Sequence, residues 1–303
     1  MNSLVLNEEL SQLSLLVIYA AMAIFTLAFF VSGYHLSQAA STKDKNLKTV
    51  SVLERVALAL ALLGTLILAA GVIMRGIAAA RVPWANLFEY SITGALILMI
   101  IFFISIRAKE VRILATFVVG FVLLVLGTAV SIFYVQVASL MPALQSYWLV
   151  IHVMVALLAS GFFSLAAALS VAYLLKTANW VEKGKTKGIR NFKKVMEVFP
   201  TKEKLEQLAY RFNIVGFILW SFTLIAGAIW AERAWHRYWG WDTKEVWTFI
   251  IWTIYAGYLH ANATRGWSGK RAVWLGLIGF AAVVFNFTFV NMFFKGLHVY
   301  SGL

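Results

Sequence analysis

The chain has 303 residues, of which 62% are hydrophobic and 13% are charged, and its mean hydropathy is +0.82, so the composition excludes a water-soluble fold. Its 26 Lys and Arg exceed its 13 Asp and Glu, but these charges lie between apolar stretches, which indicates membrane orientation and not nucleic-acid binding. The absence of Cys excludes a disulfide or a thiolate metal site within the chain.

Eight apolar segments are long enough to cross a membrane as helices, which takes about 20 residues each. None of them contains Asp, Glu, Lys or Arg. A cleavable signal is not expected, because Glu8 and Glu9 precede the first apolar run in place of a positive segment. We therefore predict an all-α polytopic membrane protein with about eight transmembrane helices, forming a single transmembrane domain over residues 1–303. The predicted spans are 12–34, 56–74, 90–106, 113–135, 148–175, 212–231, 246–264 and 272–294.

The distribution of Lys and Arg predicts the orientation of these spans. The segments after the first, third, fifth and seventh spans hold 20 of the 26 basic residues. The opposite side holds six, balanced there by six acidic residues. Because cytoplasmic segments carry the excess of Lys and Arg, the first side is assigned to the cytoplasm, and both termini are predicted to be extracytoplasmic.

The longest cytoplasmic segment is a basic loop over residues 176–211. Leu205, Leu208 and Phe212 follow one another at helical spacing, which predicts an amphipathic surface helix in its last part. Orientation and lipid contact are the favoured roles of this loop, because a basic loop is expected in any such protein. Docking of a soluble partner, or of a ligand, is the alternative.

The densest cluster of aromatic and polar residues is an extracytoplasmic tryptophan-rich loop over residues 230–247. It holds five of the 12 Trp, which is more than the usual aromatic belt at a membrane interface would supply. Indole rings offer large flat faces, so the cluster suits a flat apolar ligand such as haem. Its charged residues could meet haem propionates or pair with one another. The five tryptophans are Trp230, Trp235, Trp239, Trp241 and Trp247.

Two histidines are predicted to lie at the level of this loop. His152 begins the fifth span, and His298 follows the eighth. Two imidazoles from different spans at one level are what a bis-histidine haem site requires. Each histidine alone is more often a hydrogen-bonded interfacial residue than a ligand.

The remaining histidines have other depths. His260 lies in the last turn of the seventh span, in the cytoplasmic half, where an ionisable residue is a functional candidate, although a neutral hydrogen-bonded His competes with that interpretation. His35 ends the first span at a similar depth and could pair with His260 or be a boundary residue. His236 lies inside the tryptophan-rich loop. Solvent contact is favoured for His35 and His236.

The residues of the loop resemble a known family. The run W-G-W-D-T-K-E-V-W, residues 239–247, resembles the "WWD" signature of haem-handling proteins, in the form found in the CcsA or ResC component of System II cytochrome c biogenesis. The run P-W-A-N-L-F-E resembles a second outer segment of that family through Pro83, Asn86 and Glu89. Together with the eight-span layout, the resemblance covers nearly the whole chain.

The resemblance implies a function. The chain would be a subunit of a cytochrome c synthase, or haem lyase, that carries haem b outward and presents it for covalent thioether attachment to an apocytochrome c with a C-x-x-C-H motif. His152 and His298 match the family's external haem ligands, and His260 matches an intramembrane ligand. A CcsB- or ResB-like membrane protein would supply the second intramembrane His, and thiol-reducing proteins are further expected partners. The plasma membrane is favoured over the thylakoid membrane.

No catalytic acid or base is identified, and for Asp242 and Glu245 structural pairing with Lys244 or Arg233 is favoured over proton transfer. Two other functions stay open: a haem exporter without ligase activity, and a b-type electron-transfer subunit with haem between His35 and His260. The predicted haem-binding residues are His152, His298, His260, Trp235, Trp239, Trp241, Asp242, Glu245 and Trp247, of which the three histidines are the predicted iron ligands.

Overall fold

The structure, a computed structural model, describes residues 7–41, 48–140, 144–184, 186–264, 267–294 and 296. These residues form helices and no strand, which confirms the predicted all-α class. The elements are α1 (Glu8–Ser41), α2 (Lys48–Ala78), α3 (Leu87–Ser105), α4 (Lys109–Arg112), α5 (Ala115–Ser131), α6 (Tyr147–Lys176), α7 (Asn179–Lys183), α8 (Lys187–Val198), α9 (Lys202–Trp235), α10 (Thr243–Ala263), α11 (Lys270–Phe285), the π-helix η2 (Asn286–Val290) and α12 (Asn291–Phe293).

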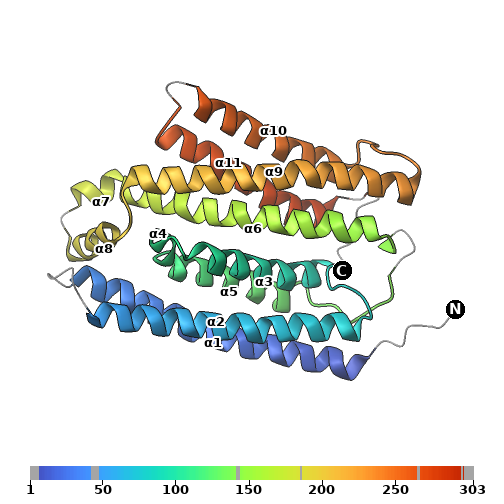
Figure 1. Cartoon of the computed structure of the whole chain (residues 1–303), viewed down its shortest axis with the longest axis horizontal. Helices are drawn as coiled ribbons and strands as arrows, with labels where there is room; N and C mark the ends of the chain where they lie inside the picture. The colour runs from blue at the N-terminus through green and yellow to red at the C-terminus, as the bar shows by residue number, and fades with distance from the viewer. Residues whose placement is uncertain are drawn as a thin grey trace.

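The long helices lie side by side in one bundle (Figure 1). The pair α1 and α2 forms one edge, α10 and α11 form the other, and α3, α5, α6 and α9 lie between them. Apart from Glu89 in its first turn, helix α3 is largely apolar on all sides, and Phe88, Met99 and Phe102 are fully buried along it. A helix without a polar face belongs in the interior, so α3 forms the centre of the core.

Every predicted span contains a helix. Six helical segments of the described chain are long and apolar enough to cross a membrane, which supports a polytopic membrane protein. Helix α5 has only 17 residues, and α10 is not among the six. That α5 and α10 also cross, giving eight spans, stays a prediction. The six segments are Glu8–Ser41, Val52–Ala78, Leu87–Ser105, Tyr147–Lys176, Lys202–Trp235 and Lys270–Phe293.

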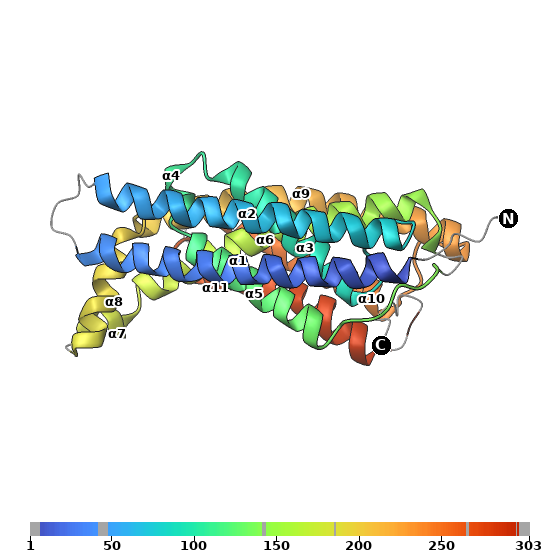
Figure 2. The ribbon, with the colours of Figure 1, turned by 90° about the horizontal axis from the view of Figure 1, so that it is seen from below.

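The basic segment differs from the prediction. Leu205 and Leu208 do lie on a helix, but it is the first part of the unbroken α9, and both side chains are buried in the core. The predicted amphipathic helix is therefore present, with Lys202 and Gln207 exposed, but it continues into the sixth span because Thr201 caps α9 ahead of the charged turn. A second amphipathic helix is α8, which buries Met196 and exposes its basic residues. Figure 2 shows α7 and α8 at the end of the bundle where α1 ends.

Candidate functional site

Residues 236–242 form the non-helical turn between α9 and α10. Helix α9 ends at His236 in the left-handed conformation, with φ 56°, and Trp241 also has a positive φ of 60°. Asp242 caps α10 and forms a capping box with Glu245. The Oε2 atom of Glu245 accepts hydrogen bonds from the backbone N–H groups of Gly240, at 2.8 Å, and Asp242, at 3.0 Å. Asp242 and Glu245 therefore fix the shape of the turn.

The five tryptophans of residues 230–247 do not form one continuous platform. Trp239 and Trp241 pack edge to face at 5.8 Å, with Trp241 74% exposed. Trp235 packs on the buried Trp230 at 4.8 Å, and Trp247 packs on a phenylalanine of α11 at 4.5 Å. Trp230 and Trp239 alone among the five line the cavity described next.

A cavity of about 270 Å³ opens beneath this turn, between α3, α6, α9, α10 and η2. Its lining is mostly apolar, and among the exceptions are His152, Lys244 and Glu245. Along α6 the lining runs from Leu149 to Ser164, about 22 Å at the helical rise. A deep, mostly apolar cavity with a few polar groups in its wall suits a flat apolar ligand with polar substituents.

The imidazole of His152 is oriented by α9. Its Nδ1 atom lies 2.9 Å from the carbonyl oxygen of Thr223, and because a carbonyl only accepts, Nδ1 carries the proton. The lone pair of the ring is then on Nε2. Histidines that bind metal usually donate their other N–H group to a carbonyl or carboxylate in this way.

The neighbours of His152 also limit where its ring can lie. A Cβ atom at Gly227 would lie 2.8 Å from Cε1 and 2.9 Å from Nδ1 of His152, so only glycine leaves space for the ring in this position. The indole of Trp230 lies nearly parallel to the imidazole, with ring centroids 6.0 Å apart and planes 20° apart. Contacts with Thr223, Gly227 and Trp230 of α9 therefore fix the position of the His152 ring.

The other predicted ligands are placed differently. His298 lies outside the described residues, but Gly296 lies so close to the Asp242 carboxylate that a side chain there would clash with it. The chain two residues before His298 is therefore beside the tryptophan-rich turn. His260 is exposed at the far end of α10, away from the cavity.

His35 is buried on α1, and its Nε2 atom makes no hydrogen bond to any described residue. Helix α1 lies at one edge of the bundle and α10, which bears His260, at the opposite edge (Figure 1). The fold does not bring these two histidines together.

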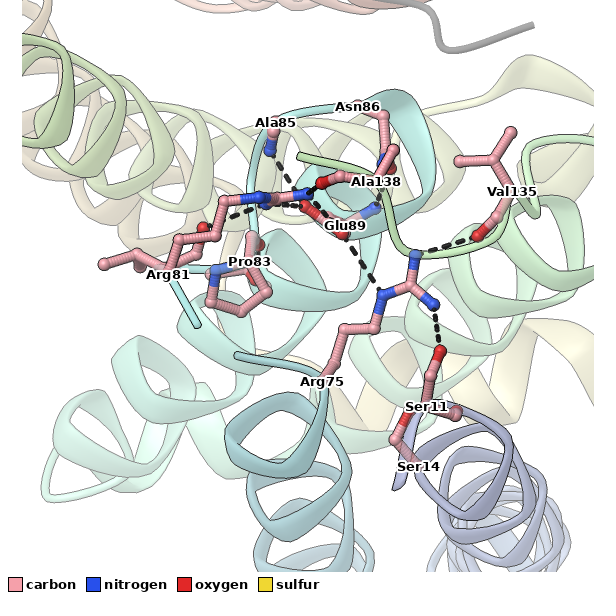
Figure 3. Close-up of polar contacts among 12 residues, drawn as sticks. Ser11, Ser14, Arg75, Arg81, Pro83, Ala85, Asn86, Glu89, Val135 and Ala138 are labelled. Atoms are coloured by element: carbon pink, nitrogen blue, oxygen red, sulfur yellow. Dashed lines mark hydrogen bonds and ion pairs between the residues drawn. The ribbon is translucent and has the colours of Figure 1, made fainter. Parts of the chain in front are cut away.

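A buried ionic cluster supports the wall of the cavity (Figure 3). The fully buried Glu89 carboxylate accepts from Nε of Arg75 at 3.2 Å and from both terminal nitrogens of Arg81 at 2.5 and 3.1 Å. The N–H group of Ala85 donates to it at 3.0 Å. Asn86, which caps α3, and Ala85 also line the cavity, so the cluster fixes this part of its wall.

Arg75 extends the cluster to two further parts of the chain. It donates to the Ser11 hydroxyl on α1 and to the Val135 carbonyl in the segment after α5, both at 2.8 Å. Sequence reasoning singled out Glu89 but missed Arg75 and Arg81 as its partners. A signal was present, because Arg75 and Arg81 border apolar runs on the predicted extracytoplasmic side, and an arginine close to an apolar interior needs an acidic partner.

Comparisons of the chain with a family model and with individual proteins agree on one family. Residues 84–298 match the family described as "Cytochrome C assembly protein". The chain is 37% identical over 180 residues to "Cytochrome c biogenesis protein CcsA" of Prochlorococcus marinus, covering 54% of the chain and 57% of the relative. A protein of the same name from Guillardia theta is 37% identical over 177 residues, covering 55% and 58%. The match thus spans a little over half the length of these relatives.

Proposed function

The chain belongs to the cytochrome c assembly protein family, and from this premise we propose that it acts in cytochrome c maturation by holding haem at the extracytoplasmic end of the bundle. Haem would lie in the cavity beneath the tryptophan-rich turn and be presented there for covalent attachment. The observation that carries the proposal is the oriented imidazole of His152 in the wall of a mostly apolar cavity bordered by Trp239.

His152 would be one axial ligand, because with the proton on Nδ1 the lone pair of the ring is on Nε2, the nitrogen that would bind the iron. His298 would be the second. The position of Gly296 beside Asp242 supports this assignment, since it brings the chain to the cavity's end of the molecule two residues before His298.

The proposed contribution of this chain to the reaction is chiefly to position haem for the apocytochrome thiols. Thioether formation adds each thiol of the apocytochrome across a vinyl group of haem, and the thiols come from the apocytochrome, since this chain has no Cys. Holding two reactants in the correct orientation can supply several kcal/mol of an activation barrier. Asp242 and Glu245 are engaged in the capping box, so their proposed role is to shape the haem-binding turn and not to transfer protons.

An inner haem site would use His260 together with a histidine of a CcsB- or ResB-like partner in the plasma membrane. The exposure of His260 on α10 supports a ligand that is completed by another chain. The separation of His35 from His260 weighs against a permanent haem between them, as a b-type electron-transfer subunit would need.

The test compares His152→Ala and His298→Ala with His236→Asn, which keeps a residue that tolerates the left-handed conformation, in cells that make c-type cytochromes. His236 is an exposed histidine of the same turn, so its variant controls for the loss of an imidazole. We expect the first two variants to lose covalent haem staining of cytochrome c and the third to retain it. Normal staining in both ligand variants would reject the external site. Released haem without covalent cytochrome in the wild type would indicate a haem exporter.

A further inference from the structure

Lys244 brings a positive charge to the cavity. It lies in the first turn of α10, its side chain lines the cavity, and its Nζ atom donates to the backbone carbonyl of Asn286 at 2.8 Å. Enclosure away from bulk water lowers the pKa of Lys244 to about 7, and the nearby Asp242 carboxylate acts in the opposite direction. An ammonium has three N–H donors, and one of them is used here.

The acidic neighbours of Lys244 accept hydrogen bonds from the backbone of the turn. Asp242 accepts from the N–H group of Lys244 at 2.9 Å as the helix cap, and Glu245 accepts from two N–H groups of the turn. The ion pairs found among the described residues do not include Lys244. The ammonium therefore has a backbone carbonyl and no carboxylate at ion-pair distance in the described chain.

The opposite wall at this point is Asn286, where the last helix widens from α11 into the π-helix η2. Asn286 is 5% exposed and lines the cavity, and its side-chain oxygen Oδ1 accepts no hydrogen bond from any described residue. π-Helical turns are frequent at functional sites. Lys244 therefore brings hydrogen-bond donors, and Asn286 a buried acceptor, to the same part of a mostly apolar wall.

A buried acceptor borders the same place. The Oε1 atom of Glu245, whose residue is 7% exposed, has no hydrogen-bond partner in the described chain. Buried polar atoms are seldom left without partners, so the unpaired oxygens of Glu245 and Asn286, together with the unused N–H donors of Lys244, indicate that a polar part of a ligand occupies this end of the cavity.

We propose that Lys244 binds a free carboxylate of the porphyrin held in the cavity, so that the site selects porphyrins whose propionates are not esterified. This inference rests on the proposed function. A charge-assisted hydrogen bond in a low-dielectric site is stronger than one in water, so losing the ligand's carboxylate lowers affinity measurably. The competing interpretation is that Lys244 only ties α10 to η2.

The test measures the affinity of the full chain, purified in detergent, for haem and for haem dimethyl ester by absorbance titration. We expect the wild type to prefer haem by at least about tenfold, the size of one charge-assisted contact. Lys244→Met is expected to bring the two affinities within about twofold of each other, mainly by weakening haem binding. Comparing the affinity ratio between variants cancels the unequal partitioning of the two porphyrins into micelles.

Lys244→Gln is the matched variant, because its amide still donates to the Asn286 carbonyl while the charge is gone. It is expected to lose the preference for haem as Lys244→Met does, which a purely structural tie would not explain. His152→Ala should weaken both porphyrins by a similar factor. An unchanged haem-to-ester ratio in Lys244→Gln would overturn the role of Lys244. Failure of the wild type to bind either porphyrin would instead overturn the proposed function.

Discussion

At the scale of single residues, Gly227 controls the position of the predicted ligand His152. Gly227→Ala places a methyl group 2.8 Å from Cε1 of the imidazole, closer than carbon atoms normally approach, so the ring must shift. Changes to groups that orient a metal-binding His typically cost about tenfold to a hundredfold in metal affinity. We expect a loss of haem affinity of about tenfold, measured by absorbance titration.

Gly257→Ala is the control for this substitution. Gly257 lies on the exposed face of α10, and a Cβ atom there would have no heavy atom within 4 Å. Alanine is favoured over glycine inside a helix, so this variant should fold at least as well as the wild type and bind haem normally. Equal haem affinity in the two variants would show that the contact with His152 does not matter.

The pKa of Lys244 predicts how porphyrin selection varies with pH. The lysine is cationic below pH 7, so the haem-to-ester affinity ratio should be constant there and fall by up to about tenfold per pH unit above it. A bound carboxylate raises the pKa of Lys244, so the affinity ratio should stop falling once the pH exceeds this higher pKa.

The other titratable groups near the cavity include Asp242, Glu245, His152, Tyr90 and Tyr238, and all of them are unchanged in Lys244→Gln, so this variant separates Lys244 from them. In Lys244→Gln the ratio should not vary with pH. A ratio that still falls above pH 7 in this variant would assign the titration to another group.

The sequence indicated some site residues and not others for a physical reason. A histidine at the end of an apolar span is conspicuous, so His152 could be proposed from its position. The roles of Lys244 and Asn286 depend on which faces of α10 and the last helix point toward each other. These residues are 42 positions apart, and no local sequence pattern shows a contact over that separation. Likewise, the tryptophans of residues 230–247 share a segment, but only the fold separates those that line the cavity from those that pack elsewhere.

At the scale of elements, the cluster around Glu89 joins α1, α2, α3 and the segment after α5. Glu89→Gln removes the charge that compensates Arg75 and Arg81, and Arg75 is fully buried. Breaking a buried ion pair by removing one partner costs about 3–5 kcal/mol, because an uncompensated charge stays in the interior. We expect a marked loss of thermal stability in detergent, measured by circular dichroism.

Glu203→Gln offers the comparison at the surface. Its pair with Lys202 is exposed, with the two atoms 3.9 Å apart, and exposed pairs contribute little. Its unfolding temperature should match that of the wild type. If Glu89→Gln were equally stable, the buried cluster would not be what holds the outer ends of these helices together.

The existence of the helices could be predicted well from apolar runs, since each predicted span contains one. Their ends could not, because hydropathy stops at the first charge whereas helices continue past it: α9 begins ten residues before the predicted span and carries Leu205 into the core. The π-helix η2 had no signal either, as nothing in the N-F-T-F-V run distinguishes it from an α-helix.

At the scale of the whole molecule, the two ends of the bundle differ in chemistry. The tryptophan-rich turn, the Glu89 cluster and the start of α1 lie at one end, and α7, α8, the end of α10 and the start of α11 lie at the other (Figure 1). The basic residues of α8 are exposed at that second end, in agreement with a cytoplasmic assignment. With this assignment we predict that α10 crosses the membrane, although it is not among the six helices that are long and apolar enough by composition.

Single cysteines test that topology, and the chain has no Cys of its own to give background. We expect Ser139→Cys to react with a membrane-impermeant maleimide in intact cells, and Lys193→Cys and Ser268→Cys to react only after permeabilisation; all three positions are exposed. Ser268 is decisive because it follows α10 directly. If α10 crosses, Ser268 shares the side of Lys193. Labelling of Ser268→Cys in intact cells would mean that α10 turns back, and the placing of His260 near the cytoplasmic face would then be wrong.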